Sequence, residues 1–253
     1  MKKINFSLCF LAGILLCSFV MVACSSDDDD DNDENGGSAN SSKRIARIID
    51  LYGKNDMIDK TYTYDAQGRI VLIKEVETYN GKEDPGEVTY QYDKNSIQCH
   101  SEDGYSVDDH IYTLANGLIV EEFYKSVSRN GIIAYTILYS YDKDGHLISI
   151  VDNDEEASTS NYDIVWKDGY ITSFGESDFT YTDIPWNKNL IFALDDYFLD
   201  PNLMLRGYFG KLPKHMPLTI GYYKYDYTLG PDGLISKITR SGYPRAEQSI
   251  TWE

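Results

Sequence analysis

Apolar and polar residues alternate with a period of two along most of the chain from residue 45 onward. The clearest example runs from Tyr62 to Ile70 and reads Tyr-Thr-Tyr-Asp-Ala-Gln-Gly-Arg-Ile. Such alternation is typical of a strand with one buried face, and Asp followed by Gly is typical of a tight turn. The pattern predicts a hairpin in which one strand ends at Tyr64 and the next begins near Ile70.

This hairpin pattern recurs along the chain. Residues 139–147 read Tyr-Ser-Tyr-Asp-Lys-Asp-Gly-His-Leu, and residues 225–235 repeat the pattern in a lengthened form. Weaker copies lie at residues 90–99, 112–119 and 162–171, while the run Asp84-Pro85-Gly86 indicates a longer loop. The repeats predict an all-β fold, a strongly curved antiparallel meander of hairpins that forms a single domain at residues 43–253.

The repeated tyrosines are open to two interpretations. Residues i and i+2 of a strand lie on one face, so each Tyr-x-Tyr pair projects together. One interpretation is a stacking platform for sugar rings or an apolar ligand, and the other is a core in which the tyrosines only pack. The ligand-binding residues of the first interpretation are Tyr64, Tyr92, Tyr141, Tyr225 and Trp186.

One segment interrupts the strand pattern. Ile-Pro-Trp at residues 184–186 ends the alternation, and Leu190, Ile191, Leu194 and Phe198 then follow at helical spacing. We expect one helical insert near residues 187–199, which Asp200-Pro201 ends and which covers one face of the curved sheet.

The N-terminus has the features of a lipoprotein signal peptide at residues 1–23. Lys2 and Lys3 precede an apolar run, and Ala23 stands directly before Cys24. This resembles a bacterial lipobox, so we expect cleavage before Cys24 and acylation of its thiol, for example by palmitate. The alternative is an ordinary signal peptide in which this cysteine is incidental.

Residues 24–42 form an acidic tether in this interpretation. The run of aspartates after Ser26 repels itself and stays hydrated, and a Gly/Ser/Asn segment follows it. An acidic stretch after a lipidated cysteine resembles a surface-export signal of Bacteroidetes lipoproteins. We therefore expect a lipid-anchored protein of the outer membrane that faces the extracellular side; a simple solvated spacer is the alternative.

The net charge limits the possible partners, and the cysteine positions limit the possible disulfides. The formal net charge is −18, which opposes binding to nucleic acid phosphates. Only one of the four cysteines, Cys99, lies in the body, so no internal disulfide is expected after processing.

Candidate chemistry is weak throughout the body. Cys99-His100 and Asp108-Asp109-His110 alternate across strands, so their members point to opposite faces. No distal Glu completes a calcium loop at residues 142–145 or 152–155. Turn chemistry accounts for the first segment and a solvated loop for the second, where a calcium site is the alternative. We expect no enzyme activity, no cofactor and no metal site.

The Tyr-x-Tyr-Asp-x-x-Gly units resemble the tyrosine-aspartate repeats of large Rhs and teneurin shells, although this chain is far too small to form such a shell. In its lipobox, acidic tail, hairpins, late insert and C-terminal hairpin the chain is similar to a Bacteroidetes lipoprotein family of unknown function with a porin-like fold. That resemblance implies a strongly curved antiparallel sheet and provides no catalytic residues. Strands such as residues 87–93 lack the alternation expected of a membrane-spanning barrel.

The favoured function is a surface-exposed, non-enzymatic binding module for a glycan or an apolar small molecule, held to the membrane by the lipid anchor at Cys24. The alternative is a structural or assembly subunit that contacts another protein of the cell envelope.

Overall fold

The computed structural model describes residues 43–52, 56–153, 159–187, 189–192, 194, 198–242 and 246–253. The chain divides into two units, Met1–Gly37 and Ser38–Glu253, and all described residues belong to the second unit. The predicted signal peptide, the lipidated Cys24 and the acidic tether therefore lie outside the described residues.

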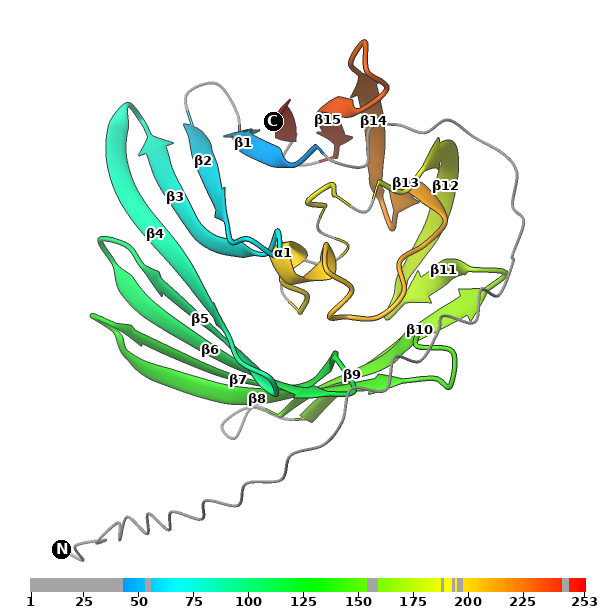
Figure 1. Cartoon of the computed structure of the whole chain (residues 1–253), viewed down its shortest axis with the longest axis horizontal. Coiled ribbons are helices and arrows are strands. Elements are labelled where there is room, and N and C mark those ends of the chain that lie inside the picture. The colour runs from blue at the N-terminus through cyan, green and yellow to red at the C-terminus, as the bar shows by residue number, and fades with distance from the viewer. Residues whose placement is uncertain are drawn as a thin grey trace, which may run out of the picture. The chain divides into compact units, whose positions relative to one another are not determined.

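Within the described part, sixteen strands form one closed antiparallel barrel in which each strand pairs with its neighbours in sequence (Figure 1). Pairing of the first strand with the last closes the ring, so the predicted curved meander is confirmed and no strand is left as a free edge. The strands are β1 (Ile45–Tyr52), β2 (Asp56–Tyr64), β3 (Ile70–Tyr79), β4 (Lys82–Tyr92), β5 (Ser96–Glu102), β6 (Ser106–Ala115), β7 (Leu118–Ser128), β8 (Gly131–Tyr141), β9 (Leu147–Asn153), β10 (Thr159–Lys167), β11 (Tyr170–Phe174), β12 (Ser177–Pro185), β13 (His215–Ile220), β14 (Tyr223–Leu229), β15 (Ile235–Ser241) and β16 (Ala246–Trp252).

Alternation along each strand separates the inside of the barrel from the outside. In β8, Ile137 and Tyr139 are buried, whereas Leu138 and Ser140 are exposed. The first tyrosine of each repeat lies on the inner face and is at most 9% exposed, as at Tyr62, Tyr90, Tyr139 and Tyr225. The core therefore lies inside the barrel, and the predicted shared face of each tyrosine pair is its inner wall.

The two ends of the barrel differ in how the chain turns. We call the end that carries the Asp-Gly turns at residues 65–69 and 142–146 the turn rim. At this rim Asp65 and Asp142 accept hydrogen bonds from backbone N–H groups, and Gly68 and Gly145 have φ of 75° and 82°. The opposite end, with tips at residues 80–81, 103–105, 129–130 and 221–222, is the hairpin rim.

The predicted insert is confirmed and lies between β12 and β13. The position predicted for its helix, near residues 187–199, is wrong. No described residue of 187–199 is helical; the only helix in the described part is α1 (Pro201–Met204). Asp200 accepts a hydrogen bond from the N–H of Asn202, and Pro201 occupies the first turn, where proline fits a helix best. Asp200-Pro201 thus starts a helix instead of ending one, and α1 is far too short to cross a membrane.

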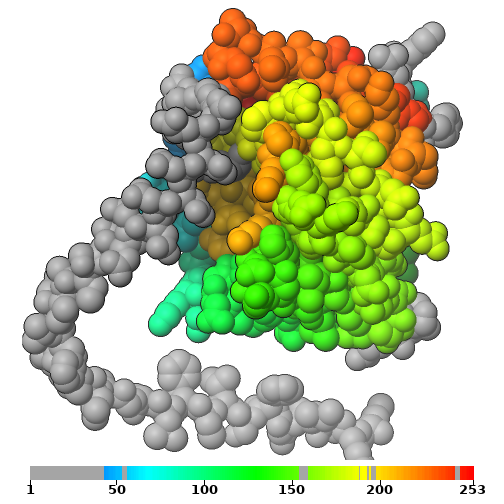
Figure 2. Space-filling view, turned by 90° about the vertical axis from the view of Figure 1, so that its right-hand side faces the viewer, coloured from blue at the N-terminus to red at the C-terminus, as the bar shows by residue number. Residues whose placement is uncertain are grey.

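The insert (residues 186–214) lies inside the ring of strands (Figure 1), and Figure 2 shows part of it, in gold, recessed between the walls. Hydrogen bonds fix it to several strands. Tyr208 O accepts from Ile119 N at 2.8 Å, and Lys211 N donates to Gly145 O at 2.9 Å. Gly210 allows this approach, because a Cβ there would lie 2.4 Å from Gly145 O.

Candidate functional site

The insert fills one half of the barrel interior closely. Phe198 packs on Tyr162 with ring centroids 4.4 Å apart, and Phe209 meets Tyr139 edge-on at 5.2 Å. The cavity lined by this part of the insert and by strands β9 to β11 has a volume of about 20 Å³. We call this region, bounded by β8 to β12, the filled half.

The other half of the interior contains a cavity of about 300 Å³. Its wall is formed by β14, β15, β16, β1, β2, β3 and β4, and we call this region the open half. From the insert, Ile191, Phe192, Pro201 and Asn202 face the cavity. Its apolar wall residues include Ile48, Ile73, Val88 and Ile238.

A belt of polar side chains crosses the wall of this cavity. Each belt residue lies two positions from a core residue of its strand, always toward the hairpin rim, so both share the inner face. Gln248 Nε2 donates to Asp50 Oδ1 at 2.9 Å, and Lys60 Nζ lies 3.8 Å from Asp50 Oδ2. From β15 to β3 the belt consists of Arg240, Gln248, Asp50, Lys60 and Glu75.

Two atoms beside the cavity are buried without a partner among the described residues. They are Nε of Arg240, a donor, and Oδ1 of Asn202, an acceptor. The guanidinium of Arg240 also lies over the ring of Tyr223, 4.7 Å from its centroid. A buried polar atom without a partner is costly, so these two positions call for a ligand or a water.

The four tyrosines predicted to bind a ligand do not form one site. Tyr225 lines the cavity, but Tyr64, Tyr92 and Tyr141 lie at the turn rim. Their hydroxyls donate to backbone carbonyls at 2.7–2.8 Å, to Ile45, Ile70 and Ile119 respectively. These rings join neighbouring hairpins, and ligand binding by them stays a prediction.

Trp186 does not line the cavity but packs against Phe192, which does. It packs edge-on against Phe192 with centroids 5.7 Å apart, and Phe192 in turn packs against Tyr225 at 5.2 Å. Trp186 therefore supports the aromatic side of the cavity without lining it.

A buried polar network joins the wall to the insert outside the cavity. Glu122 is 5% exposed; its oxygens lie 2.7 Å from His110 Nδ1 and 2.6 Å from the hydroxyl of Tyr139, which also reaches Phe198 O. Burial alone would lower the pKa of His110, but the hydrogen bond and charge of Glu122 raise it above its usual value.

Asp200 is a second acidic group deep in the interior. Its carboxylate accepts hydrogen bonds from the hydroxyl of Tyr90 and the N–H of Asn202, both at 2.8 Å. Burial raises the pKa of Asp200 despite these hydrogen bonds, because a low-dielectric interior disfavours the charged form.

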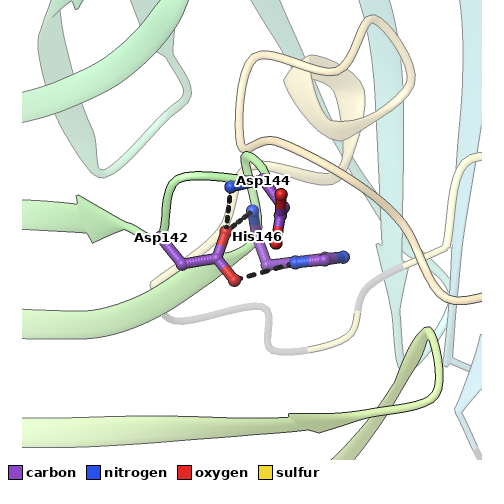
Figure 3. Close-up of side chains that lie close together, drawn as sticks. All are labelled: Asp142, Asp144 and His146. Carbon is purple, nitrogen blue, oxygen red and sulfur yellow. Dashed lines mark hydrogen bonds and ion pairs between the residues drawn. The ribbon is translucent and has the colours of Figure 1, made fainter.

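The described residues contain one cluster with metal-ligand atoms close together: Asp142, Asp144 and His146, within 4.8 Å of one another (Figure 3). Asp142 uses both of its oxygens inside the turn. Oδ1 accepts from the backbone N–H groups of Asp144 and His146, and Oδ2 lies 2.9 Å from the His146 ring. These bonds with His146 hold the pKa of Asp142 below its usual value.

The other candidates weighed in the sequence also have structural positions. Cys99 points inward, and burial raises the pKa of its thiol, so the thiol stays protonated and unreactive. His100 points outward and pairs with Asp109 at 2.7 Å. Asp154 and Glu155 of the open calcium question lie outside the described residues.

Sequence reasoning missed the polar belt, although a signal for it was present. In β1, Asp50 follows core residue Ile48 by two positions, and in β3 Glu75 follows Ile73 in the same way. A charged residue in phase with the core predicts a polar inner surface. Asn202 had no such signal, because its place depends on how the insert folds.

A family match and a solved structure with a TM-score above 0.5 support this fold. The family described as a domain of unknown function (DUF4595) with porin-like fold matches residues 62–228. A crystal structure of a porin-like protein from Bacteroides uniformis is similar at 15% identity with a TM-score of 0.60, over 83% of this chain and 98% of that one. A porin-like protein from Bacteroides vulgatus covers 83% of this chain and 99% of its own at 11% identity, with a TM-score of 0.29.

The curated proteins contain no significant sequence match to this chain. The family match spans well over half of the 253 residues and contains most of the barrel. The chain therefore belongs to the family of domains of unknown function with a porin-like fold.

Proposed function

We propose that this protein is a non-enzymatic binding module that holds a small ligand in the open half of its barrel. The observation that carries the proposal is the open cavity of about 300 Å³ between wall and insert, which is lined by both apolar and charged side chains. Sites of this kind, concave and mostly apolar with a few placed polar groups, are the usual form of a small-molecule pocket.

Of the two ligand classes expected, the lining favours a glycan over an apolar molecule. An apolar ligand would cover the polar belt and remove Lys60, Glu75 and Arg240 from water without giving them partners, which is costly. A sugar instead offers hydroxyls to the belt and C–H faces to rings such as Tyr62 and Phe192.

The experiment is native mass spectrometry of the full chain, extracted gently from its own membrane. We expect a bound small molecule whose mass is lost in Ala246→Trp, because Ala246 lines the cavity and tryptophan would fill it. Thr251→Trp on the outer side of the same strand, where residue 251 is exposed, is the matched control and should keep the ligand. An unliganded wild-type chain that also binds no added small molecule would refute the proposal.

The non-enzymatic part is tested separately. Incubation with bound glycans should release no new reducing ends, even over long times. Release that disappears in Asp50→Asn or Glu75→Gln would instead identify a hydrolase that uses belt carboxylates.

We place the module at the outer membrane, held by acylated Cys24 and facing outward. The support for this proposal is the lipobox and the acidic run after it. An external protease should degrade the body on intact cells, and Cys24→Ser should release the protein from the membrane fraction. Survival of the body until the outer membrane is permeabilised would refute the outward orientation.

The alternative, an assembly subunit of the envelope, is favoured by one observation at the hairpin rim. At the tip between β7 and β8, Ile132 is 68% exposed and Ile133 is 60% exposed. Exposed apolar side chains of this size are typical of contact surfaces. An envelope protein that cross-links to the wild type and is lost in Ile132→Ser, with the cavity empty in both, would favour this alternative.

A further inference from the structure

We infer that the cavity takes the terminal, uncharged sugar unit of a glycan, which enters from the hairpin rim and is recognised by Arg240 and Asn202. The inference rests on the proposed function and names the ligand class and the residues that select it.

The charge balance of the lining points to an uncharged ligand. Arg240 and Lys60 carry positive charge, and Asp50 and Glu75 carry negative charge, so the belt is neutral as a whole. A further lining carboxylate, Glu247, is paired with Lys237 at 2.6 Å. A charged ligand would gain one attractive contact and bring an uncompensated charge into a partly buried space.

The two unpartnered atoms point to hydroxyl groups. Arg240 Nε needs an acceptor and Asn202 Oδ1 needs a donor, and both residues line the same cavity. A hydroxyl both accepts and donates, so a polyhydroxylated ring serves the wall and the insert together. Both atoms are buried, so each side chain has to turn toward the cavity to present its atom to the ligand.

The size and aromatic content of the cavity fit one ring. A volume of about 300 Å³ lies at the lower end of the usual ligand pockets, which suits a single sugar unit better than several. Tyr62, Tyr225 and Phe192 supply aromatic surface for the apolar face of that ring.

The route into the cavity indicates that the ligand is the end of a glycan. Toward the turn rim the insert is bound to the wall, where Asn189 Nδ2 donates to Lys43 O at 3.0 Å and Arg206 donates to Gln67 O at 2.9 Å. The polar belt lies on the hairpin-rim side of the apolar floor, and Tyr52 of this rim also lines the cavity. We therefore expect a glycan to insert one end, with its next unit beside the hairpin rim.

The test uses the detergent-solubilised full chain on an array of neutral, uronate-containing and amino-sugar oligosaccharides, with N-phenyl-1-naphthylamine as a neutral apolar probe. Variants are Arg240→Met, Arg240→Lys and Ala246→Trp, with Thr251→Trp as the control. Circular dichroism and the thermal midpoint confirm that each variant is folded. Arg240→Met keeps an apolar stem beside Tyr223 and removes the donor group.

We expect binding of neutral glycans, competition by the methyl glycoside of their terminal unit alone, and loss of binding in Ala246→Trp. Arg240→Met should weaken binding about tenfold, the change that one good polar contact gives, while binding of the apolar probe stays the same. Arg240→Lys should recover only part of the loss, because lysine lacks the planar donor geometry.

Other results would overturn the inference without overturning the proposed function. These are binding of acidic or amino glycans alone, binding of the apolar probe alone, or full affinity in Arg240→Met, each abolished by Ala246→Trp. If no probe binds and the chain extracted from its membrane carries no ligand, the inference and the proposed function both fail.

Discussion

The filled and open halves of the barrel use one architecture for two purposes. In both halves the wall is an antiparallel meander whose inner face carries Ile and Tyr. The cavity between insert and wall has a volume of about 20 Å³ in the filled half and about 300 Å³ in the open half. The insert is therefore both the core of one half and one wall of the candidate site in the other.

The halves differ, in several strands, at the inner position that lies two residues from a core residue toward the hairpin rim. In β8 and β10 of the filled half these are Ile137 and Tyr162, next to core residues Tyr139 and Ile164. From β15 to β3 of the open half the corresponding positions are charged or polar, and burying unpaired charge against the insert would be costly. The contrast does not extend to every strand, because β4 of the open half has Val88 and β9 of the filled half has Asp152 at this position.

The comparison predicts the largest loss of stability for a buried ring of the insert in the filled half. Phe209→Ala should lower the free energy of unfolding by about 3–5 kcal/mol, because Phe209 is 4% exposed and packs on Tyr139. Phe123→Ala is the control; it lies on the outer face at 41% exposed and should cost far less. Guanidinium denaturation measures both, and equal losses would mean that the insert is not part of the core.

A matched pair of isoleucines compares the two halves directly. Ile150→Ala should lower the free energy of unfolding by an amount near the upper end of the range of about 2–5 kcal/mol, because the Ile150 side chain is 0% exposed. The loss for Ile238→Ala should lie near the lower end of this range, because Ile238 borders the cavity and its truncation removes fewer contacts. If Ile238→Ala were the costlier change, the open half would be packed as tightly as the filled one.

A third prediction concerns the buried polar network of the wall. Glu122→Gln should cost about 1.5–3 kcal/mol at pH 6, because it removes the charged partner of His110. The pKa of His110 is raised in the folded state, so its stabilisation is complete below its usual value of 6.5 and is lost as the pH rises through the raised pKa. Unfolding free energies measured from pH 6 to 8 should fall in the wild type and fall less in Glu122→Gln.

The neighbouring residue provides the control for this network. Glu121 is exposed, so Glu121→Gln should leave the wild-type pH dependence unchanged. A pH dependence that is the same in all three proteins would show that the pair of His110 and Glu122 does not contribute.

The hairpins and their turns were predictable from sequence because their signals are local. Asp and Gly at the turn and alternation in the strands need no distant partner, as Asp65 and Gly68 show. The loop expected around Pro85 is absent, because this residue lies in a strand. It lies in β4, pairs with Val76 of β3, and stands beyond the paired part of β5, so its missing N–H leaves no partner unsatisfied.

The insert and the candidate site depend on contacts between distant segments and were predicted poorly. The apolar residues from Leu190 to Phe198 follow helical spacing, but in the structure they belong to the core of a closed barrel. Their sequence alone does not reveal that the barrel closes around them. Arg240 and Asp50 are about 190 positions apart in sequence, and only pairing of β1 with β16 brings their strands close. Non-local pairing of this kind leaves no short-range signal.

The smallest expected loss of stability concerns the tyrosine hydrogen bonds of the turn rim, which both halves share. Tyr141→Phe keeps the ring and removes the 2.7 Å hydrogen bond to Ile119 O, so it should cost about 0.5–1.5 kcal/mol. Tyr64→Phe removes the equivalent 2.8 Å bond to Ile45 O at the open half and should cost the same. Tyr79→Phe, 63% exposed at the hairpin rim, is the control and should be neutral in urea denaturation. Because the turn rim is built alike around the barrel, unequal costs at Tyr141 and Tyr64 would show that the halves differ in their rims as well as in their interiors.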